Sequence, residues 1–512
     1  MGNEQASLPV PRQPPCSMFC ISLRPHRKIE LVHAPPKVAM IVQKVANEVN
    51  RLYTGHHMDT PTKDKLGVLQ FTMAADLFVT ASGKEPATMG KLFCIKILEE
   101  LHKIGFDLVI GSDLMRARFS ASALFFRKVA EERPPAKVIC VAPGKEDRII
   151  LINHDHRVKS IVEETVRNAW PSGIQRSEEE EVLGHVLHEL KMNGYPWRAS
   201  EANIDNNRIV NMVVENLSKI NLRLVGGINI KGGTDSLFFL ADPKTTKTQF
   251  CSISLCRKNR LRLVDCKEET EIARRVIEQN SGFHIEDESV REHHAKLKLS
   301  GKPWHCSGKE AVLARQLVAR IGEAMLQRGW ALTEAIDISR REDDKSMLLF
   351  QKCSPTNNAS IACICLTSTD HLRLIDFNPG DQEVLKTCVL ENYMPGVNGV
   401  DSSEGRSLKF DLVGSPWGSW DWGLHARHLL LHLFEAASSL GFQVIASADV
   451  SSKFATDGDG NPDYPLDVHS IFLVKMPTHT VVSGSFRDVK ETVKDFGKNL
   501  ASRLPTYEEA MR

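Results

Sequence analysis

Three histidines in the last quarter of the chain have the spacing of metal ligands. His425, His428 and His432 stand at positions i, i+3 and i+7, which places them on one stripe of a helix. Imidazole nitrogens are common ligands of Zn²⁺. One repeat earlier along the chain, however, Gln316 and Arg320 occupy the positions of His428 and His432. This comparison favours a polar, solvent-facing stripe, so the sequence predicts no metal site and no cofactor.

A second group of oxygen-bearing residues alternates as calcium ligands do. The pattern consists of Asp457, Asp459, Asn461 and Asp463. The twelfth position of the loop, where calcium binding needs a glutamate, is Val468. We therefore expect a long hairpin loop rich in turn residues rather than an ion site.

Ser177 precedes a run of four glutamates, from Glu178 to Glu181. The run could be an acidic phosphorylation site, or Ser177 could cap a helix whose Glu180 reaches back to it. Helix capping is the favoured interpretation, and the two are compatible.

The sequence contains no motif of an established catalytic chemistry. It lacks GxSxG, P-loop, HExxH and dinucleotide-binding patterns, and the glycine pairs within 226–233 lack the following helix that a phosphate site needs. One polar position recurs in each repeat described below, and its residues share polarity but no catalytic group: His33, Asn153, Asp265 and Asp376. We expect a protein that is not an enzyme.

The N-terminal sequence MGNEQAS partly fits the pattern for N-myristoylation. Gly2 follows the initiator methionine, but residue 6 is alanine and the preferred serine comes one position later. Cys16 could carry a second acyl chain, since one chain alone gives only marginal membrane binding. The alternative is an ordinary N-terminal arm.

Tryptophans crowd the segment PWGSWDWG. Trp417 has counterparts in Trp197 and Trp304, each preceded by proline, and these three are predicted to fill module cores. Trp420 and Trp422 have no counterpart elsewhere, so they are predicted to bind a partner.

The elements that position these residues form a repeat of about 110 residues. Paired alternating strands recur four times, at 19–33, 139–153, 251–265 and 363–376. An amphipathic helix, a strand, a second helix and a hairpin follow each pair. A glycine or asparagine ends each second helix. The sequence thus predicts an α+β fold of four β-β-α-β-α-β-β modules, each an antiparallel sheet with two helices on one face.

The modules are expected at 18–128, 137–242, 249–352 and 361–476, between a Pro-rich, disordered arm at 1–17 and a helical tail at 477–512. A tandem array can also be cut before the Pro-Trp strand, in which case the N-terminal segment would complete the last module and close the array. That unit reads strand, helix, four strands, helix. It is similar in element order alone to the duplicated half of the TATA-binding protein, with no shared motif.

Net charge, cysteine placement and hydrophobic stretches disfavour several classes of function. The net charge of +1 disfavours general nucleic-acid binding. Cys140, Cys251, Cys363 and Cys365 lie in apolar runs, no signal peptide opens the chain, and no stretch is long enough to span a bilayer. We expect a cytoplasmic repeat protein that acts as a scaffold for protein partners, with peripheral membrane association through Gly2. The second-ranked alternative binds a small molecule or lipid between modules, and the third is an enzyme with a site between modules.

Overall fold

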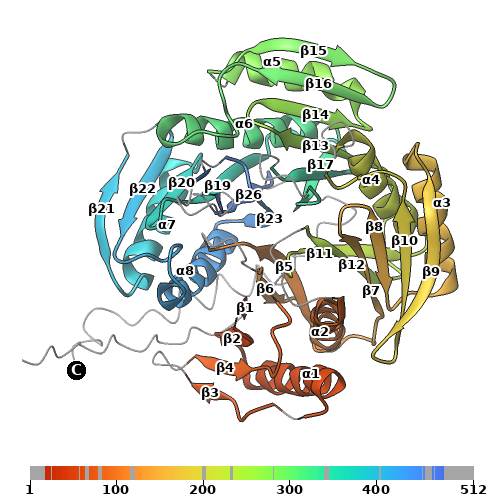
Figure 1. Ribbon diagram of the computed structural model, residues 1–512. Helices are drawn as coiled ribbons and strands as arrows, with labels where there is room; N and C mark the ends of the chain where they lie inside the picture. The colour runs from red at the N-terminus through yellow and green to blue at the C-terminus, as the bar shows by residue number, and fades with distance from the viewer. Residues whose placement is uncertain are drawn as a thin grey trace, which may run out of the picture.

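Four antiparallel sheets of six strands each build this protein (Figure 1). The structure is a computed structural model. It describes residues 18–477 except 25, 57, 64–67, 79–83, 116–120, 199–202, 231–233, 281, 340–344, 403–404, 452–453, 456–463 and 466–467. The fold class and the fourfold repeat predicted from the sequence are both confirmed.

Each module contributes one sheet and two long helices. The first comprises β1 (Met18–Arg24), β2 (Lys28–Val32), α1 (Pro36–Thr54), β3 (Thr62–Lys63), β4 (Leu69–Thr72), α2 (Lys84–Lys103), β5 (Phe106–Ser112) and β6 (Ala123–Lys128). The second comprises β7 (Val138–Gly144), β8 (Arg148–Ile152), α3 (His156–Ala169), β9 (Ile174–Val182), β10 (His185–Met192), α4 (Asn203–Lys219), β11 (Leu222–Ile228) and β12 (Ser236–Ala241).

The other two modules repeat this order. The third comprises β13 (Phe250–Cys256), β14 (Arg260–Val264), the short 3-10 helix η2 (Lys267–Glu269), α5 (Thr270–Asn280), β15 (Ile285–Val290), β16 (His294–Leu299), α6 (Gly308–Gln327), β17 (Trp330–Ile336) and β18 (Met347–Lys352). The fourth comprises β19 (Ser360–Thr367), β20 (His371–Ile375), α7 (Pro379–Asn392), β21 (Val397–Asp401), β22 (Ser407–Leu412), α8 (Trp420–Ser439), β23 (Phe442–Ala448) and β26 (Ser470–Lys475), with a small hairpin of β24 (Phe454–Ala455) and β25 (Tyr464–Pro465).

All four sheets share one strand order, for example β9-β10-β8-β7-β12-β11 in the second module. Each therefore has one strand more than the sequence predicted, at the outer edge: β3, β9, β15 or β21. Polar residues fill most of these edge strands, so they lack the apolar alternation that marks a half-buried strand. Ser177 lies inside β9, and the prediction that it caps a helix is wrong.

The central strands are buried on both faces. Every residue of β13 is buried, and β1 is buried except at Arg24. Residues on one face pack against the helices of their own module. On the other face, two residues in the middle of each first strand are small, which lets a neighbouring helix approach closely: Cys20 and Ser22, Cys140 and Ala142, Ser252 and Ser254, and Cys363 and Cys365. The described cysteines form no disulfide.

The second helix of each module packs on the sheet of the next module. Helix α2 contacts β7, α4 contacts β13, and α6 contacts β19. Each of these interfaces will be called a seam and numbered by the two modules that it joins. Each seam contains one apolar core shared by the two modules. At seam 1–2, for example, α1, α2 and the first sheet pack against Cys140, Ile228 and Phe238 of the second module.

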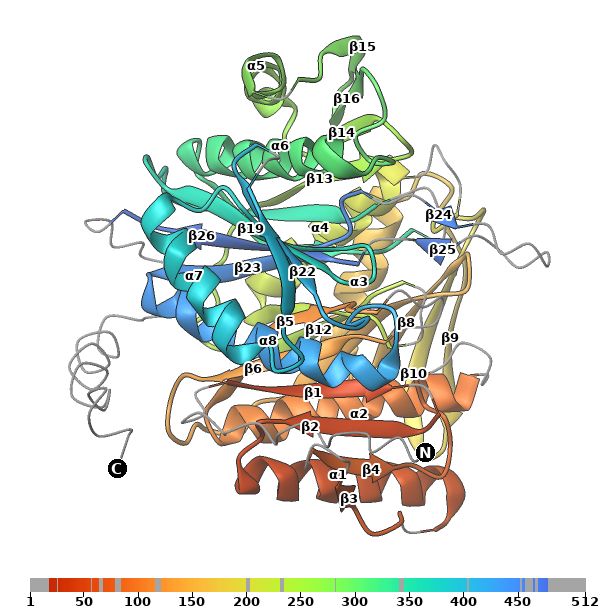
Figure 2. The same ribbon diagram turned by 90° about the vertical axis from the view of Figure 1, so that its left-hand side faces the viewer.

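A fourth seam closes the array into a ring. Helix α8 lies against β1 and β2 (Figure 2), and one core unites α7 and α8 with Met18, Cys20 and Phe125. Closure was expected through pairing of the terminal segments, and the structure closes differently. Among the described residues, strand β1 pairs with β2 and β6 of its own module alone, so side-chain packing joins these two modules. The sheets also exclude the alternative cut, because each sheet takes all its strands from one module that begins at β1, β7, β13 or β19.

The innermost strands β5, β11, β17 and β23 surround the centre of the ring. Each carries a β-bulge near its middle, and such bulges turn a strand and redirect its side chains. In the part of the chain that the structure describes, no helix combines the length and apolarity needed to cross a membrane.

Candidate functional site

One backbone feature places a polar side chain at every seam. The residue that follows the second strand of each module has a positive φ, between 58° and 62°: His33, Asn153, Asp265 and Asp376. Histidine, asparagine and aspartate tolerate this left-handed conformation better than most side chains. The conformation explains why the position is polar in each module while its chemistry varies.

At the first three seams this polar residue meets a complementary group. Asn153 donates to Glu99 of α2 at 3.3 Å, and Asn211 of α4 donates to Asp265 at 2.9 Å. At seam 3–4, Asp376 accepts hydrogen bonds from Gln316 and Arg320 of α6, each at 2.9 Å. Each of these contacts pairs a donor with an acceptor.

A glutamate recurs at one position of all four second helices: Glu99, Glu215, Glu323 and Glu435. The carboxylates of Glu99 and Glu323 accept the backbone N–H groups of Val138 and Ile361, at 2.9 and 2.8 Å, where the next module begins. Burial raises the pKa of Glu99. This position is not among the residues predicted from the sequence, although aligning the helices on their last turns reveals it.

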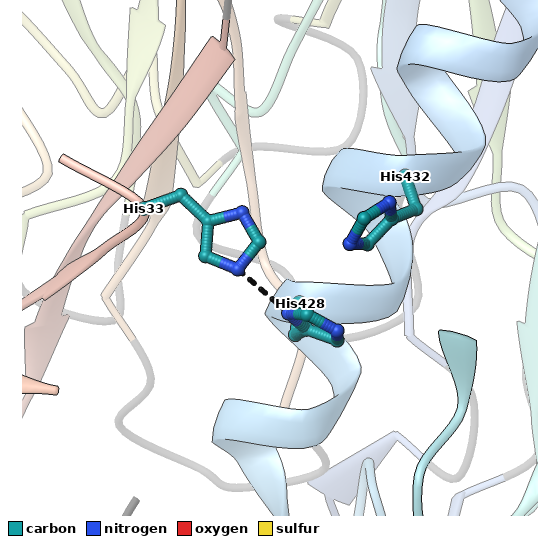
Figure 3. Close-up of side chains that lie close together, drawn as sticks. All are labelled: His33, His428 and His432. Atoms are coloured by element: carbon teal, nitrogen blue, oxygen red, sulfur yellow. Dashed lines mark hydrogen bonds between the residues drawn. The ribbon is translucent and has the colours of Figure 1, made fainter. Parts of the chain in front are cut away.

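The fourth seam brings three histidines together (Figure 3). His33 comes from the first module, and His428 and His432 come from α8 in the last. One ligand nitrogen from each lies within 4.8 Å of the other two. His33 Nε2 and His428 Nδ1 are 2.7 Å apart and share a hydrogen bond. His432 Nε2 is buried without a hydrogen-bond partner among the described residues.

The environment keeps these imidazoles neutral. Burial, followed by the charge of His432, lowers the pKa of His33 to about 4. Burial and the neighbouring histidines lower the pKa of His428 to about 3, and burial lowers the pKa of His432. Neutral imidazole is the form that binds metal ions.

The expectation of a solvent-facing histidine stripe is therefore wrong. His428 is buried and His432 is partly buried, because α8 covers the sheet of the first module. His425 is also buried, but its ring lies near Tyr393 and Trp422, at 6.4 and 5.9 Å between centroids, and it stands apart from the cluster.

The two unique tryptophans occupy different surroundings at the same end of α8. Trp420 is half-buried, with the guanidinium groups of Arg24 and Arg427 at 4.9 and 5.9 Å from its ring centre. Trp422 covers Gly414, which has a φ of 85° and no room for a Cβ beneath the indole. Partner binding by these tryptophans stays a prediction.

The predicted core tryptophans are all fully buried. Trp197 and Trp304 donate their indole N–H groups to the carbonyls of Arg148 and Arg260, at 2.8 and 3.0 Å. This shared contact ties the start of the second helix to the second strand.

At the centre of the ring, each module forms a reciprocal backbone contact with the next. Asp235, the residue before β12, makes two hydrogen bonds with Asp337 of the third module. Its N–H donates to the Asp337 carbonyl at 2.6 Å, and its carboxylate accepts the Asp337 N–H at 2.7 Å. The same exchange joins three further pairs: Ser122 with Asn229, Ser346 with Asp449, and His469 with Asp113. The last pair joins the fourth module to the first.

Two buried carboxyl groups lie at seam 2–3. Burial raises the pKa of Asp235 to about 7 and that of Glu334 to about 8. Gly226 makes room for Glu334, since a Cβ there would lie 3.1 Å from the Glu334 carboxyl oxygen. Burial therefore favours the protonated form of both groups, and their carboxyl oxygens accept the backbone N–H groups of Asp337 and Ala335.

A serine, a histidine and a glutamate also meet in the second module. Ser177 Oγ lies 3.2 Å from His188 Nε2 and also bonds to Glu163, whose carboxylate is 3.4 Å from the same Nε2 atom. In a catalytic triad the acid orients the opposite ring nitrogen. Here His188 Nδ1 has no hydrogen-bond partner among the described residues, so the arrangement lacks the geometry of a triad.

Several predicted residues lie outside the described part of the chain. Among them are the acylation candidates Gly2 and Cys16, and the alternating Asp457, Asp459, Asn461 and Asp463. The arm at 1–17 and nearly all of the tail at 477–512 lie outside it as well.

Comparison with known proteins supports the repeat. One domain-family model matches the chain three times, at residues 137–240, 249–351 and 360–472. No curated protein and no solved structure matches the chain. The three matches cover the second, third and fourth modules, and the first module has the same strand order. Since the matches span more than half of its residues, the chain belongs to the family of this repeated α+β domain.

Proposed function

We propose that this ring is a non-enzymatic scaffold that binds an extended segment of a partner protein along the free edge of β21. The observation that carries the proposal is the difference between the four outer edge strands. Within the part of the chain that the structure describes, each pairs with one strand, so its other side offers backbone N–H and C=O groups to an added strand.

Three of the four edges carry features that oppose strand addition. Strand β9 contains glutamates at 178–181, and β15 contains acidic residues at 286–288. Charged side chains on an edge disfavour pairing with another chain, and so does a very short strand such as β3, with two residues.

Strand β21 has neither protection. Its sequence is VNGVD, with one charged residue at the end, and Val400 is 41% exposed. The strand lies at the rim of the ring, where no other element covers it in the view of Figure 1. An extended, uncharged polypeptide fits this edge, because main-chain hydrogen bonds supply the affinity and Val400 offers an apolar contact.

The test uses the purified full-length chain and an array of immobilised extended peptides. The peptide that binds best is then added during hydrogen–deuterium exchange. Bound peptide should slow exchange of the amides in 397–401. The Val400→Lys substitution should weaken peptide binding at least tenfold, because it places a charge on the edge.

Val290→Lys is the matched control, since Val290 is 51% exposed on the equivalent strand β15. Binding should survive this change. Protection of another region, or equal loss in both variants, would contradict the proposal.

A membrane tether at Gly2 is part of the same proposal and rests on the MGNEQAS sequence alone. The mass of the N-terminal peptide from chain expressed in eukaryotic cells measures it directly. Myristoylation adds one acyl chain, which Gly2→Ala must remove. An unmodified N-terminus would leave the scaffold without its tether.

A further inference from the structure

We propose that His33, His428 and His432 bind one Zn²⁺ ion that fastens the last module to the first. Three observations lead to this inference: the identity of the side chains, their convergence across the closing seam, and the contrast with seam 3–4.

The side chains converge from two separate parts of the fold. His33 projects from the left-handed residue after β2, while His428 and His432 lie one turn apart on α8 (Figure 3). The sequence separation of His33 and His428 is 395 residues, so both become ligands only when the ring is closed. An ion bound here therefore favours the closed arrangement by mass action.

The His33–His428 distance requires only a small adjustment, and the ligand nitrogen of His432 lies within 4.8 Å of both. Two nitrogen ligands at 2.0–2.1 Å from a tetrahedral Zn²⁺ lie about 3.3 Å from each other. His33 Nε2 and His428 Nδ1 are now 2.7 Å apart and share one proton. An ion would replace that proton, which a neutral imidazole can carry on its other nitrogen, and the two rings would separate slightly.

His432 has the free atom that a third ligand needs. Its Nε2 is buried and accepts no hydrogen bond from the described residues, and a buried polar atom without a partner costs free energy. Coordination would satisfy it. The remaining position of a tetrahedral ion would hold water.

Seam 3–4 shows what this seam lacks. At seam 3–4 the equivalent residues are Asp376, Gln316 and Arg320, which bond to one another directly. Two hydrogen bonds at seam 3–4 therefore join α6 to the residue that follows β20. Among the described residues of the closing seam, one bond makes the equivalent link, between His33 and His428. A metal ion would supply the further links.

The experiment measures Zn²⁺ binding to the full chain after removal of metal with a chelator. Isothermal titration and elemental analysis should give one ion per chain, and Zn²⁺ should raise the thermal unfolding temperature. Co²⁺ serves as a spectroscopic probe, because histidine nitrogens in a tetrahedral arrangement produce visible d–d absorption.

Two variants and one control make the result specific. His428→Gln should weaken Zn²⁺ binding at least tenfold. The triple variant His33→Asp/His428→Gln/His432→Arg copies the residues of seam 3–4, so it should remain folded without metal and show no stabilisation by Zn²⁺. His425→Gln changes a histidine on the same helix outside the cluster and should retain the site.

The inference is overturned if the wild-type chain binds no stoichiometric Zn²⁺, or if the triple variant binds it equally well. Equal loss of binding in His425→Gln and His428→Gln would also overturn it. Failure of peptide binding at β21 would leave this result unaffected, since the two tests read different surfaces.

Discussion

Seam 3–4 and the closing seam 4–1 have the same backbone frame and different chemistry. In both, a left-handed residue after the second strand faces the second helix of the preceding module. Seam 3–4 fills this frame with an aspartate, a glutamine and an arginine, and seam 4–1 fills it with three histidines. The frame sets where polar groups meet, and the residues in it decide the chemistry of the contact.

The two seams also differ in how they are packed. Phe434 of α8 meets Phe125 of β6 edge to face, with ring centres 5.1 Å apart. The equivalent position in α6 is Gly322, against which Ile361 of the next module packs closely. The closing seam has no peptide connection between its modules, and a large aromatic contact from the helix contributes to holding it.

The largest expected difference between the two seams comes from removing the Phe434–Phe125 contact. Phe434→Ala should lower the free energy of unfolding by about 3–5 kcal/mol, as buried phenylalanine truncations do. Hydrogen exchange should quicken in β1 and β6 as well as in α8, because the shared core spans the seam. Phe239→Ala, in the core of the second module, is the size-matched control and should leave β1 protected.

A loss of protection restricted to α8 would show that the closing seam contributes little. A cost under about 1 kcal/mol, well below the usual range for buried phenylalanine, would argue the same way.

Acid should weaken the closing seam more than the others. The folded-state pKa values of His33 and His428 lie below the ordinary value of 6.5. Stability is then complete above pH 6.5 and falls as the unfolded chain takes up protons below it. At pH 5 the loss is at most about 2 kcal/mol for each histidine.

Chemical denaturation of metal-free chain at pH 7 and pH 5 measures this loss. The triple variant that copies seam 3–4 should lose less than the wild type over the same interval. An identical pH dependence in the two chains would place the titrating groups elsewhere.

The smallest expected effect concerns the recurring glutamate. Glu323 accepts the Ile361 N–H and pairs with Arg320, so Glu323→Gln should cost about 1 kcal/mol through the lost charge. Equilibrium unfolding measures it, with Glu391→Gln on the exposed side of α7 as the control. If both substitutions cost the same, the glutamate position is not part of the seam's stability.

The repeat was predictable from the sequence because its signals are local. Alternating strands and the residues that end the second helices recur in every module, and Pro-Trp corners recur in the last three. The structure shows positive φ at each of these helix ends: Gly105, Asn221, Gly329 and Gly441. The outer edge strands were missed for an equally local reason, since a strand such as β9 buries almost none of its side chains.

The histidine cluster could not be predicted in the same way. Its members come together only through the packing of α8 on the first sheet, and no local pattern encodes that contact. Comparison between repeats does not reveal the cluster either, because the sequence alone does not show that Gln316 and Arg320 are interface residues. Both in fact bond to Asp376 across a seam. Reading the strand-end residues together with the helix residues would have indicated a shared interface.

Ring closure changes how this protein can come apart. An open stack of repeats unravels from its first and last units, which have one neighbour each and need polar caps. Here the described sheets each have a helix layer on either side, the last module supplying it for the first. Fraying therefore has no natural starting point, and opening any single interface converts a closed assembly into one with two newly exposed apolar surfaces.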